Sequence, residues 1–220
     1  IVMNKVILRV YTREVDKECY PAGLANSVHF SYKVEGEEEK PLHKNYGILF
    51  VEGVITSEDT IAPRGVKNPM LFTLKDGTYG VCAEVIWENG MTDENCSEKV
   101  FWWSTKDFVS YKKEGFMSLT EVASSNPATS IELSYEVLEK AIQYWTPIVN
   151  TGVELASEVN VTDSKQLNDI KATCVYSDGS KHEKNVLWDS STIDFNKPGT
   201  YSIDGKVLCN HYPFPLTKGY

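Results

Sequence analysis

Residues 68–111 read NPMLFTLKDGTYGVCAEVIWENGMTDENCSEKVFWWSTKDFVSY. Short runs rich in β-branched and aromatic residues alternate here with polar turns, the pattern of an antiparallel meander. The turn at 75–77 contains Asp76-Gly77, a pair that accepts the positive φ of a tight hairpin. The stretch therefore predicts four strands, which we place at residues 68–74, 78–87, 99–104 and 108–112.

A sheet this small cannot bury both of its faces alone, so it needs a second sheet beside it. The N-terminal region contains a related pattern: residues 6–11 correspond to 80–85, and residues 27–32 correspond to 98–103. Repeated meanders of this kind are typical of β-propellers. We therefore predict a mainly β chain in which residues 1–119 form two blades of a partial five-bladed propeller.

Composition restricts the possible partners. The chain has 220 residues and a formal net charge of −9, which argues against nucleic acid and against anionic membranes as partners. No apolar run approaches the roughly 20 residues of a membrane span. Because the sequence starts at Ile1 and not at methionine, we expect a processed or trimmed piece of a longer protein.

The second half of the chain predicts a linker and a further domain. Residues 134–145 place apolar side chains at helical spacing, with Ser134 as the candidate N-cap and Glu136 in the first turn. We expect this one short helix, within a linker at 120–150, to pack one domain against the other. Residues 151–210 show short strands with regular turn signals, which predict a small β-sandwich with Trp188 in its core.

Five cysteines at positions 19, 82, 96, 174 and 209 include no CxxC pair and no zinc spacing, so we expect no metal site and no other cofactor. The favoured interpretation is a set of scattered, mostly buried thiols without a structural disulfide. A Cys82–Cys96 or a Cys174–Cys209 bridge is the weaker alternative.

The segment 171–207 has a specific pattern. It contains KATCVYSDGS at 171–180, VLWD at 186–189 and IDFNKPGTYSIDGKV at 193–207. In the order of these elements it resembles the bacterial Ig-like domains of group 4. The resemblance implies an Ig-like domain at 151–210 in a bacterial, extracellular or cell-surface, multidomain protein.

The pattern P-x-L-F-x-x-x-D-G-x-Y-G at 69–80 and the sequence WSTKDFVSY at 103–111 are similar to a blade of family 43 glycoside hydrolases. In this comparison YPFPLTKGY at 212–220 looks like the lead-in to the strand that carries the family's catalytic base. The resemblance implies a secreted enzyme that hydrolyses arabinofuranosides or xylosides of plant or host polysaccharides with inversion.

Inverting hydrolysis needs a general acid and a general base about 6.5–9.5 Å apart. The positions comparable to the family's acids are Lys67 and Asn68, and neither is a carboxylic acid. We therefore expect no catalytic residue in this chain. A following polypeptide would complete the propeller and supply the acids.

Five residues are candidates for substrate binding: Trp102, Trp103, Glu84, Arg13 and His29. An indole can stack on a sugar ring, and adjacent strand residues point to opposite faces, so only one of the two tryptophans can be exposed. Packing roles for the histidine and solvent-facing or ion-paired roles for the glutamate are the alternatives. Besides part of a hydrolase, the sequence allows a non-catalytic module that binds a glycan or a protein, or a spacer.

Overall fold

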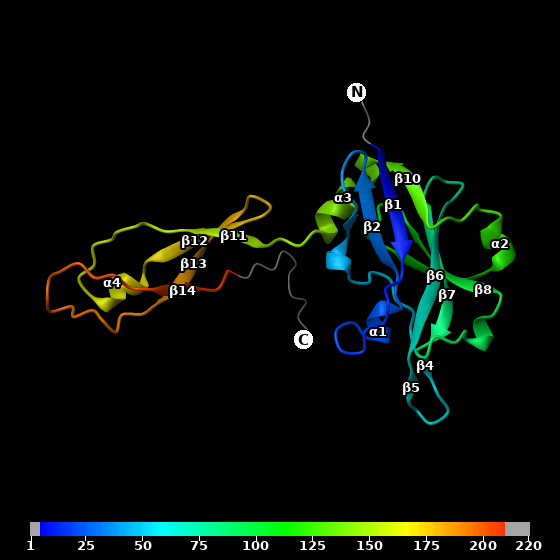
Figure 1. Ribbon diagram of the computed structural model, residues 1–220, viewed down its shortest axis with the longest axis horizontal. Helices are drawn as coiled ribbons and strands as arrows, with labels where there is room; N and C mark the ends of the chain where they lie inside the picture. Colours follow the sequence, from blue (N-terminus) through cyan, green and yellow to red (C-terminus); the bar gives the residue numbers. More distant parts are fainter. Residues whose placement is uncertain (1–4, 210–220) are drawn as a thin grey trace. The chain divides into compact units, whose positions relative to one another are not determined.

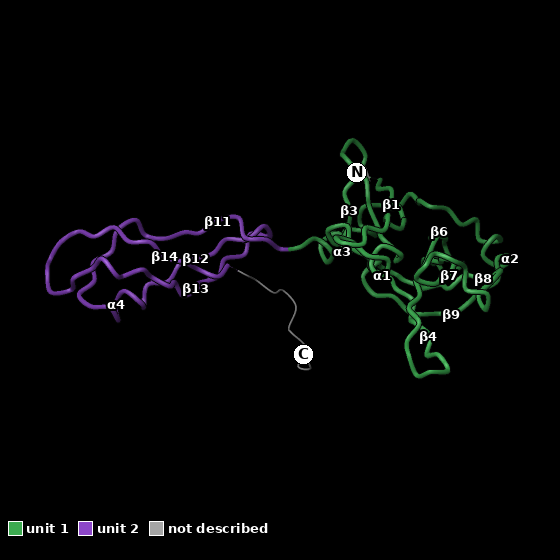
Figure 2. Tube along the Cα trace, turned by 60° about the horizontal axis from the view of Figure 1, so that its bottom comes forward, with its two compact units in different colours: residues 1–147 green, residues 148–220 purple. Residues whose placement is uncertain are grey.

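The computed structural model describes residues 5–209, and the predicted lead-in at 212–220 lies outside this range. The chain divides into two compact units, Ile1–Pro147 and Ile148–Tyr220, which Figure 2 shows in different colours. Both units are built mainly from antiparallel strands. We describe each unit by itself.

The first sheet of unit 1 has the strand order β10-β1-β2-β3 (Figure 1). Its strands are β10 (Ser130–Ser134), β1 (Lys5–Tyr11), β2 (His29–Val34) and β3 (Lys40–Pro41). Strand β1 alternates as the sequence predicts, with Val6, Leu8 and Val10 buried and the residues between them exposed. Strand β10 pairs antiparallel with β1 and comes from the region predicted to be a linker.

The second sheet has the order β6-β7-β8-β9 and contains the opening stretch. Its strands are β6 (Arg64–Thr73), β7 (Tyr79–Trp87), β8 (Lys99–Thr105) and β9 (Lys112–Ser118). The predicted turn is confirmed, because Gly77 has a φ of +83° between β6 and β7. The strands predicted at 78–87 and 99–104 agree with β7 and β8 to within one residue, whereas β6 begins four residues before the predicted start at 68.

The fourth predicted strand, at 108–112, is wrong. Phe108 is fully buried and has a φ of +56°, which lies outside the extended region of regular strands. The Thr105 hydroxyl accepts the N–H of Phe108, and the Asp107 carboxylate accepts the N–H groups of Val109 and Ser110. These side-chain acceptors satisfy the backbone locally, so the segment forms a loop and β9 starts only at Lys112.

Strand β6 contains a bulge at Asn68 and Pro69, where its pairing with β7 shifts between Lys67 and Met70. Asn68 has a φ of +51°. Proline has no N–H to donate, and β6 is an edge strand of its sheet, so the residue is tolerated at this position. The bulge turns the strand and changes which of its side chains face the core.

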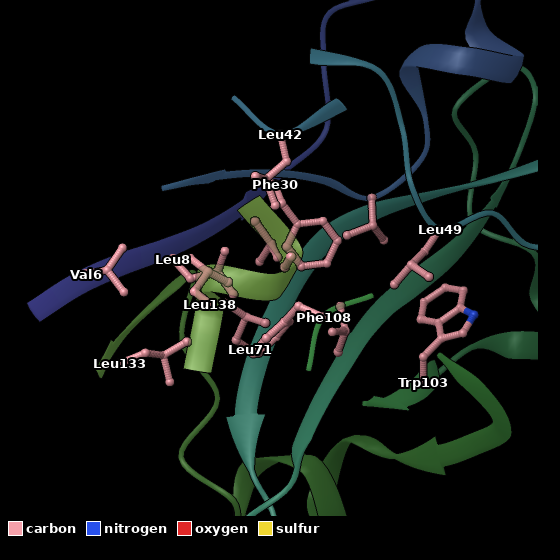
Figure 3. Packing of buried hydrophobic residues seen from close by; sticks show 14 of the residues in the cluster. Val6, Leu8, Phe30, Leu42, Leu49, Leu71, Trp103, Phe108, Leu133 and Leu138 are labelled. Atoms are coloured by element: carbon pink, nitrogen blue, oxygen red, sulfur yellow. The ribbon is translucent and has the colours of Figure 1, made fainter. Parts of the chain in front are cut away.

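One hydrophobic core lies between the elements of unit 1 (Figure 3). Both sheets contribute to it: Val6, Leu8 and Phe30 come from the first, and Leu71 and Trp103 from the second. Helix α3 (Tyr135–Trp145) adds Leu138 and Ala141, which lie on its inward face. The sequence predicted this helix correctly, including Ser134 at the N-cap position, although the Ser134 side chain makes no capping hydrogen bond.

The predicted pair of propeller blades is corrected by this arrangement. The two sheets share one core with α3, and residues 5–209 show no five-bladed propeller. The physical reason lies in residues 120–147, which belong to the predicted linker at 120–150. They supply the leading strand of the first sheet and the helix that covers the core, so the sheets bury their apolar faces within this unit.

The other face of the second sheet has a smaller cluster of Phe72, Cys82, Val100 and Val122. Val122 belongs to the short helix α2 (Leu119–Ala123), which begins with a capping box between Ser118 and Glu121. The remaining elements of unit 1 are α1 (Ala22–Ala25), η1 (His43–Asn45), β4 (Val54–Ile55), β5 (Ile61–Ala62) and η2 (Glu94–Cys96).

Unit 2 contains four strands in sequential order: β11 (Asn150–Glu154), β12 (Lys171–Tyr176), β13 (Lys181–Trp188) and β14 (Gly205–Val207), with helix α4 (Ser164–Asn168) before β12. The first half of β13 pairs with β12 and its last residues pair with β14. The predicted YSDGS hairpin is confirmed, with Gly179 at a φ of +81°. The four strands form one sequential meander, whereas the sequence predicted the two facing sheets of a sandwich.

Candidate functional site

The two adjacent tryptophans of β8 point to opposite faces of the sheet, as predicted. Trp103 is 2% exposed and lies in the main core near Leu49 (Figure 3), so it presents no stacking surface. Trp102 is partly buried in the smaller cluster, with its ring centroid 5.8 Å from that of Phe72. Of the two, only Trp102 has an accessible part.

Glu84 and Asn68 are brought together at the bulge of β6. The Asn68 side-chain amide donates a hydrogen bond to the Glu84 carboxylate at 2.5 Å. Asn68 is therefore held by its side chain as well as by its left-handed backbone. This pairing gives Glu84 a structural partner and places no second acid beside it.

Arg13 and His29, which are distant in the sequence, meet at Tyr20. The Arg13 guanidinium lies over the Tyr20 ring, 3.8 Å from its centroid. His29 is fully buried, and its Nε2 lies 2.6 Å from the Tyr20 hydroxyl. Its Nδ1 lies 2.9 Å from the carbonyl oxygen of Ser27, which can only accept, so Nδ1 carries the proton and Tyr20 donates to Nε2.

Burial lowers the pKa of His29, with a further contribution from the positive charge of Arg13. The neutral form agrees with the hydrogen bonds to both ring nitrogens. His29 is therefore a fixed packing residue without a free nitrogen for a ligand. Arg13 makes no ion pair among residues 5–209, and its contacts are the Tyr20 ring and the carbonyl oxygen of Asn45.

The neighbouring turn has an unusual backbone. His43, Lys44 and Asn45 have φ values of +55°, +53° and +64°, three left-handed residues in succession. Each such residue costs roughly 1–2 kcal/mol when it has a side chain. Left-handed segments of this kind often mark functional positions.

Several hydrogen bonds hold this turn. Tyr11 donates its hydroxyl to the Asn45 side chain at 2.6 Å, and Arg13 donates to the Asn45 carbonyl at 2.8 Å. Gly47 donates its N–H to the Tyr20 hydroxyl at 3.1 Å. A Cβ at Gly47 would lie 1.9 Å from Ser27 Oγ, so this position accepts only glycine without rearrangement.

A chain of touching aromatic rings runs from Tyr20 to the surface. The Tyr20 and Tyr46 centroids are 5.9 Å apart, those of Tyr46 and His43 are 6.1 Å apart, and those of His43 and Trp145 are 5.0 Å apart. Tyr144 continues the chain beside Trp145. Tyr46 is 49% exposed and Tyr144 is 42% exposed.

We call this group the ring surface. It consists of Arg13, Tyr20, His43, Asn45, Tyr46, Tyr144 and Trp145. Exposed rings beside arginine and amide groups can pack against an apolar ring face and form hydrogen bonds to hydroxyl groups around it. Among the residues nominated from the sequence, only Arg13 and His29 belong to or border this group.

Sequence reasoning missed the other members of the ring surface. They come from the loop before α1, from η1 and from the last turn of α3. No spacing pattern connects these segments, because their contacts depend on the folded chain. The sequence HKNYG at 43–47 contained one local signal, Asn45, because asparagine tolerates the positive φ that this turn adopts.

A pocket of about 460 Å³ lies at one end of the second sheet, lined by residues that include Asp76, Asp107, Glu114 and Tyr111. Hydrogen bonds from Thr78 lower the pKa of Asp76, and a hydrogen bond from Ser104 lowers that of Glu114. These carboxyls are thus ionised at neutral pH.

Asp107 is also held ionised. Burial alone would raise its pKa, but the N–H groups of Ser110 and Val109 together with Lys140 lower it. Inverting hydrolysis requires a carboxyl that keeps its proton at neutral pH. Every carboxyl of residues 5–209 with a displaced pKa is displaced downward, so these groups include no evident proton donor.

In the described part of the chain, no cluster of three or more His, Cys, Asp or Glu side chains is arranged to hold a metal ion. Within the same range, no helix has the length and apolar character needed to cross a membrane.

Comparison with known proteins bears on unit 2. Residues 170–209 match the family model of the bacterial Ig-like domain (group 4). No curated protein matches the chain, and no solved structure matches it. The resemblance stated for β12, β13 and the segment before β14 is confirmed over these residues, whereas no match supports a family 43 propeller. The Ig-like match is typical of bacterial proteins that are often extracellular.

Proposed function

We propose that unit 1 is a non-catalytic carbohydrate-binding module and that the Ig-like unit 2 is a spacer in a secreted or cell-surface bacterial protein. The observation that carries the proposal is the ring surface, in which Tyr46 is 49% exposed and contacts a fixed, left-handed turn. A preorganised aromatic surface loses little entropy on binding.

The polar groups beside these rings support a sugar as the ligand. Arg13 has no carboxylate partner among residues 5–209 and uses one of its donors on the Asn45 carbonyl. Its remaining N–H groups can donate to sugar hydroxyl oxygens, since guanidinium presents five donors. Stacking on Tyr46 would fix the sugar ring while these donors select its orientation.

Glycan-array screening of the whole chain, followed by calorimetry with a ligand found there, tests the proposal. We expect Tyr46→Ala to weaken binding about tenfold, the equivalent of losing one aromatic contact. The matched control is Phe116→Ala on β9, because Phe116 is 45% exposed and lies on the other sheet. The proposal fails if no glycan binds, or if both substitutions weaken binding equally.

A second candidate is a protein-binding module, favoured by the hairpin of β4 and β5. Ile55 and Ile61 form a cross-strand pair and are 75% and 74% exposed. An exposed apolar pair at a hairpin is a common element of protein contacts. Loss of a partner on Ile55→Ser, with glycan binding unchanged, would support this function for the hairpin.

A part in the hydrolysis of arabinofuranosides or xylosides stays a prediction. It requires a general acid other than the carboxyls with displaced pKa values, because these are ionised at neutral pH, and we expect that acid in polypeptide outside residues 5–209. Hydrolysis of nitrophenyl arabinofuranosides or xylosides by the 220-residue chain alone would contradict the non-catalytic assignment.

A further inference from the structure

Two cysteines of unit 2 lie in direct contact. The Sγ atoms of Cys174 and Cys209 are 3.1 Å apart, although both residues are free thiols in this structure. A disulfide has an S–S distance of about 2.0 Å, so the sulfurs need to move by only about 1 Å to bond. The other pair considered from the sequence is Cys82 and Cys96. Cys82 lies in the small cluster of unit 1, whereas the Cys96 thiol donates a hydrogen bond to the Asp93 carboxylate.

The two cysteines are held at this distance by their surroundings. Cys174 is fully buried in β12, where it pairs with Val153 on one side and with His182 on the other. Cys209 follows β14, and its carbonyl oxygen accepts a hydrogen bond of 2.6 Å from the Tyr176 hydroxyl. This contact positions the backbone of Cys209 beside β12 independently of the thiols.

Unit 2 has little else to hold its end in place. Its buried hydrophobic side chains among residues 148–209 are Leu167, Ala172, Cys174 and Tyr176. Several large apolar side chains of the same unit are exposed: Val149, Val153, Leu155, Val159, Leu187, Phe195, Tyr201 and Leu208. Small domains with thin cores commonly depend on a covalent link.

We propose that Cys174 and Cys209 form a disulfide that ties the segment after β14 to β12. These strands are not neighbours, because β13 lies between them in the sheet order. The link therefore joins parts of the unit that no strand ladder connects directly. An oxidising, extracellular location of this chain would favour the bond.

The oxidant is a disulfide, either that of a dithiol oxidoreductase or, in vitro, oxidised glutathione. The thiolate of the more accessible Cys209 attacks one sulfur of the oxidant and releases the other as a thiol. The thiolate of Cys174 then attacks Cys209 Sγ in the mixed disulfide and releases the second thiol. Two protons and two electrons have passed from the cysteines to the oxidant.

The test uses the whole chain with Cys19→Ser, because Cys19 is exposed and would form intermolecular bridges. The protein is equilibrated with oxidised glutathione, unfolded without reductant, alkylated and digested. We expect a cross-linked peptide pair containing Cys174 and Cys209, while Cys82 and Cys96 carry the alkylating reagent. Alkylation of both Cys174 and Cys209 after this treatment would overturn the proposal.

A second measurement separates a stabilising bond from an incidental one. Fluorescence of Trp188 reports urea unfolding of unit 2 when the other tryptophans are replaced by phenylalanine. Reduction is expected to lower the urea midpoint of unit 2, and Cys209→Ser is expected to abolish this dependence on redox state. A dependence that persists in Cys209→Ser, or a midpoint that reduction does not change, would count against the bond.

Discussion

The contact between Phe72 and Gly80 gives a quantitative test of the packing in the opening stretch. These residues are directly opposite each other in β6 and β7. A Cβ added at Gly80 would lie 2.2 Å from Cζ, 2.3 Å from Cε2 and 2.7 Å from Cε1 of the Phe72 ring. The ring is 1% exposed and lies directly over the glycine, so it has no free space to move into.

Gly80→Ala is therefore expected to destabilise unit 1 by about 1–3 kcal/mol, the usual cost of overpacking. Phe72→Leu removes all three of the ring atoms that the new methyl would meet. In that background the same glycine substitution should be neutral or should stabilise by about 0.5–1 kcal/mol, because alanine loses less entropy than glycine in a strand. The coupling between the two substitutions is thus about 1–4 kcal/mol.

The coupling is measured by a double-mutant cycle with urea unfolding, which gives the free energy of unfolding for each of the four proteins. Replacing Trp188 by phenylalanine in all of them restricts the fluorescence signal to unit 1. Gly23→Ala is the control, because nothing lies within 4 Å of its added Cβ. If Gly80→Ala costs the same with and without the Phe72 ring, the assigned register and contact are wrong.

Asp93→Asn is expected to cost about 1–3 kcal/mol, because it removes the charge that the buried Asp93 presents to the partly buried Arg64, whose Nε also donates to the Glu52 carbonyl. Burial would raise the pKa of Asp93, but Arg64 and nearby donors lower it. The stabilisation by this carboxylate is therefore present above about pH 4 and is lost as the pH falls through the folded pKa. Lys44→Gly should stabilise unit 1 by about 0.5–1 kcal/mol by relieving a φ of +53°. Thermal melts measure this change. Lys33→Gly in the regular strand β2 is the control and should destabilise unit 1 in the same melts. Burial raises the pKa of Cys82 to about 12, so a thiol reagent at pH 8 should modify exposed Cys19 and spare Cys82 until the chain is unfolded.

Local turn chemistry accounts for the parts of the fold that the sequence predicted. Gly77 and Gly179 both follow aspartate, and both adopt the positive φ that the Asp-Gly pattern indicates. Apolar spacing was also sufficient to predict helix α3 and strand β1, because each of these elements buries a single face. In these cases the deciding interactions lie within a few residues of one another.

The errors came from interactions over longer distances along the chain. Strand β10 is short and polar, and it becomes a strand because β1 offers an unpaired edge more than a hundred residues earlier. Phe108 looked like a strand residue, but the acceptors on Thr105 and Asp107 favour a loop. The similarity of the two meanders was real as a pairing pattern, whereas the number of sheets around the core depended on residues 119–147.

The candidate site was predictable only in part, for a similar reason. Arg13 and His29 were nominated singly, and the structure explains both through Tyr20, which the sequence gave no reason to choose. Trp102 and Trp103 were equal candidates for stacking, and the structure places Trp103 in the core. Large aromatic residues stabilise a core most, so their presence alone says little about binding.

The lowered pKa values of Asp76, Asp107 and Glu114 disfavour these carboxyls of unit 1 as general acids. A general acid or base must change its protonation during a reaction, and its pKa is tuned to allow this. Here His29 is held neutral by bonds to both nitrogens, and Asp76, Asp107 and Glu114 are held ionised by their donors. Of these groups, His29 contacts the ring surface through Tyr20, and its two fixed hydrogen bonds would help the proposed surface to recognise a ligand without rearrangement.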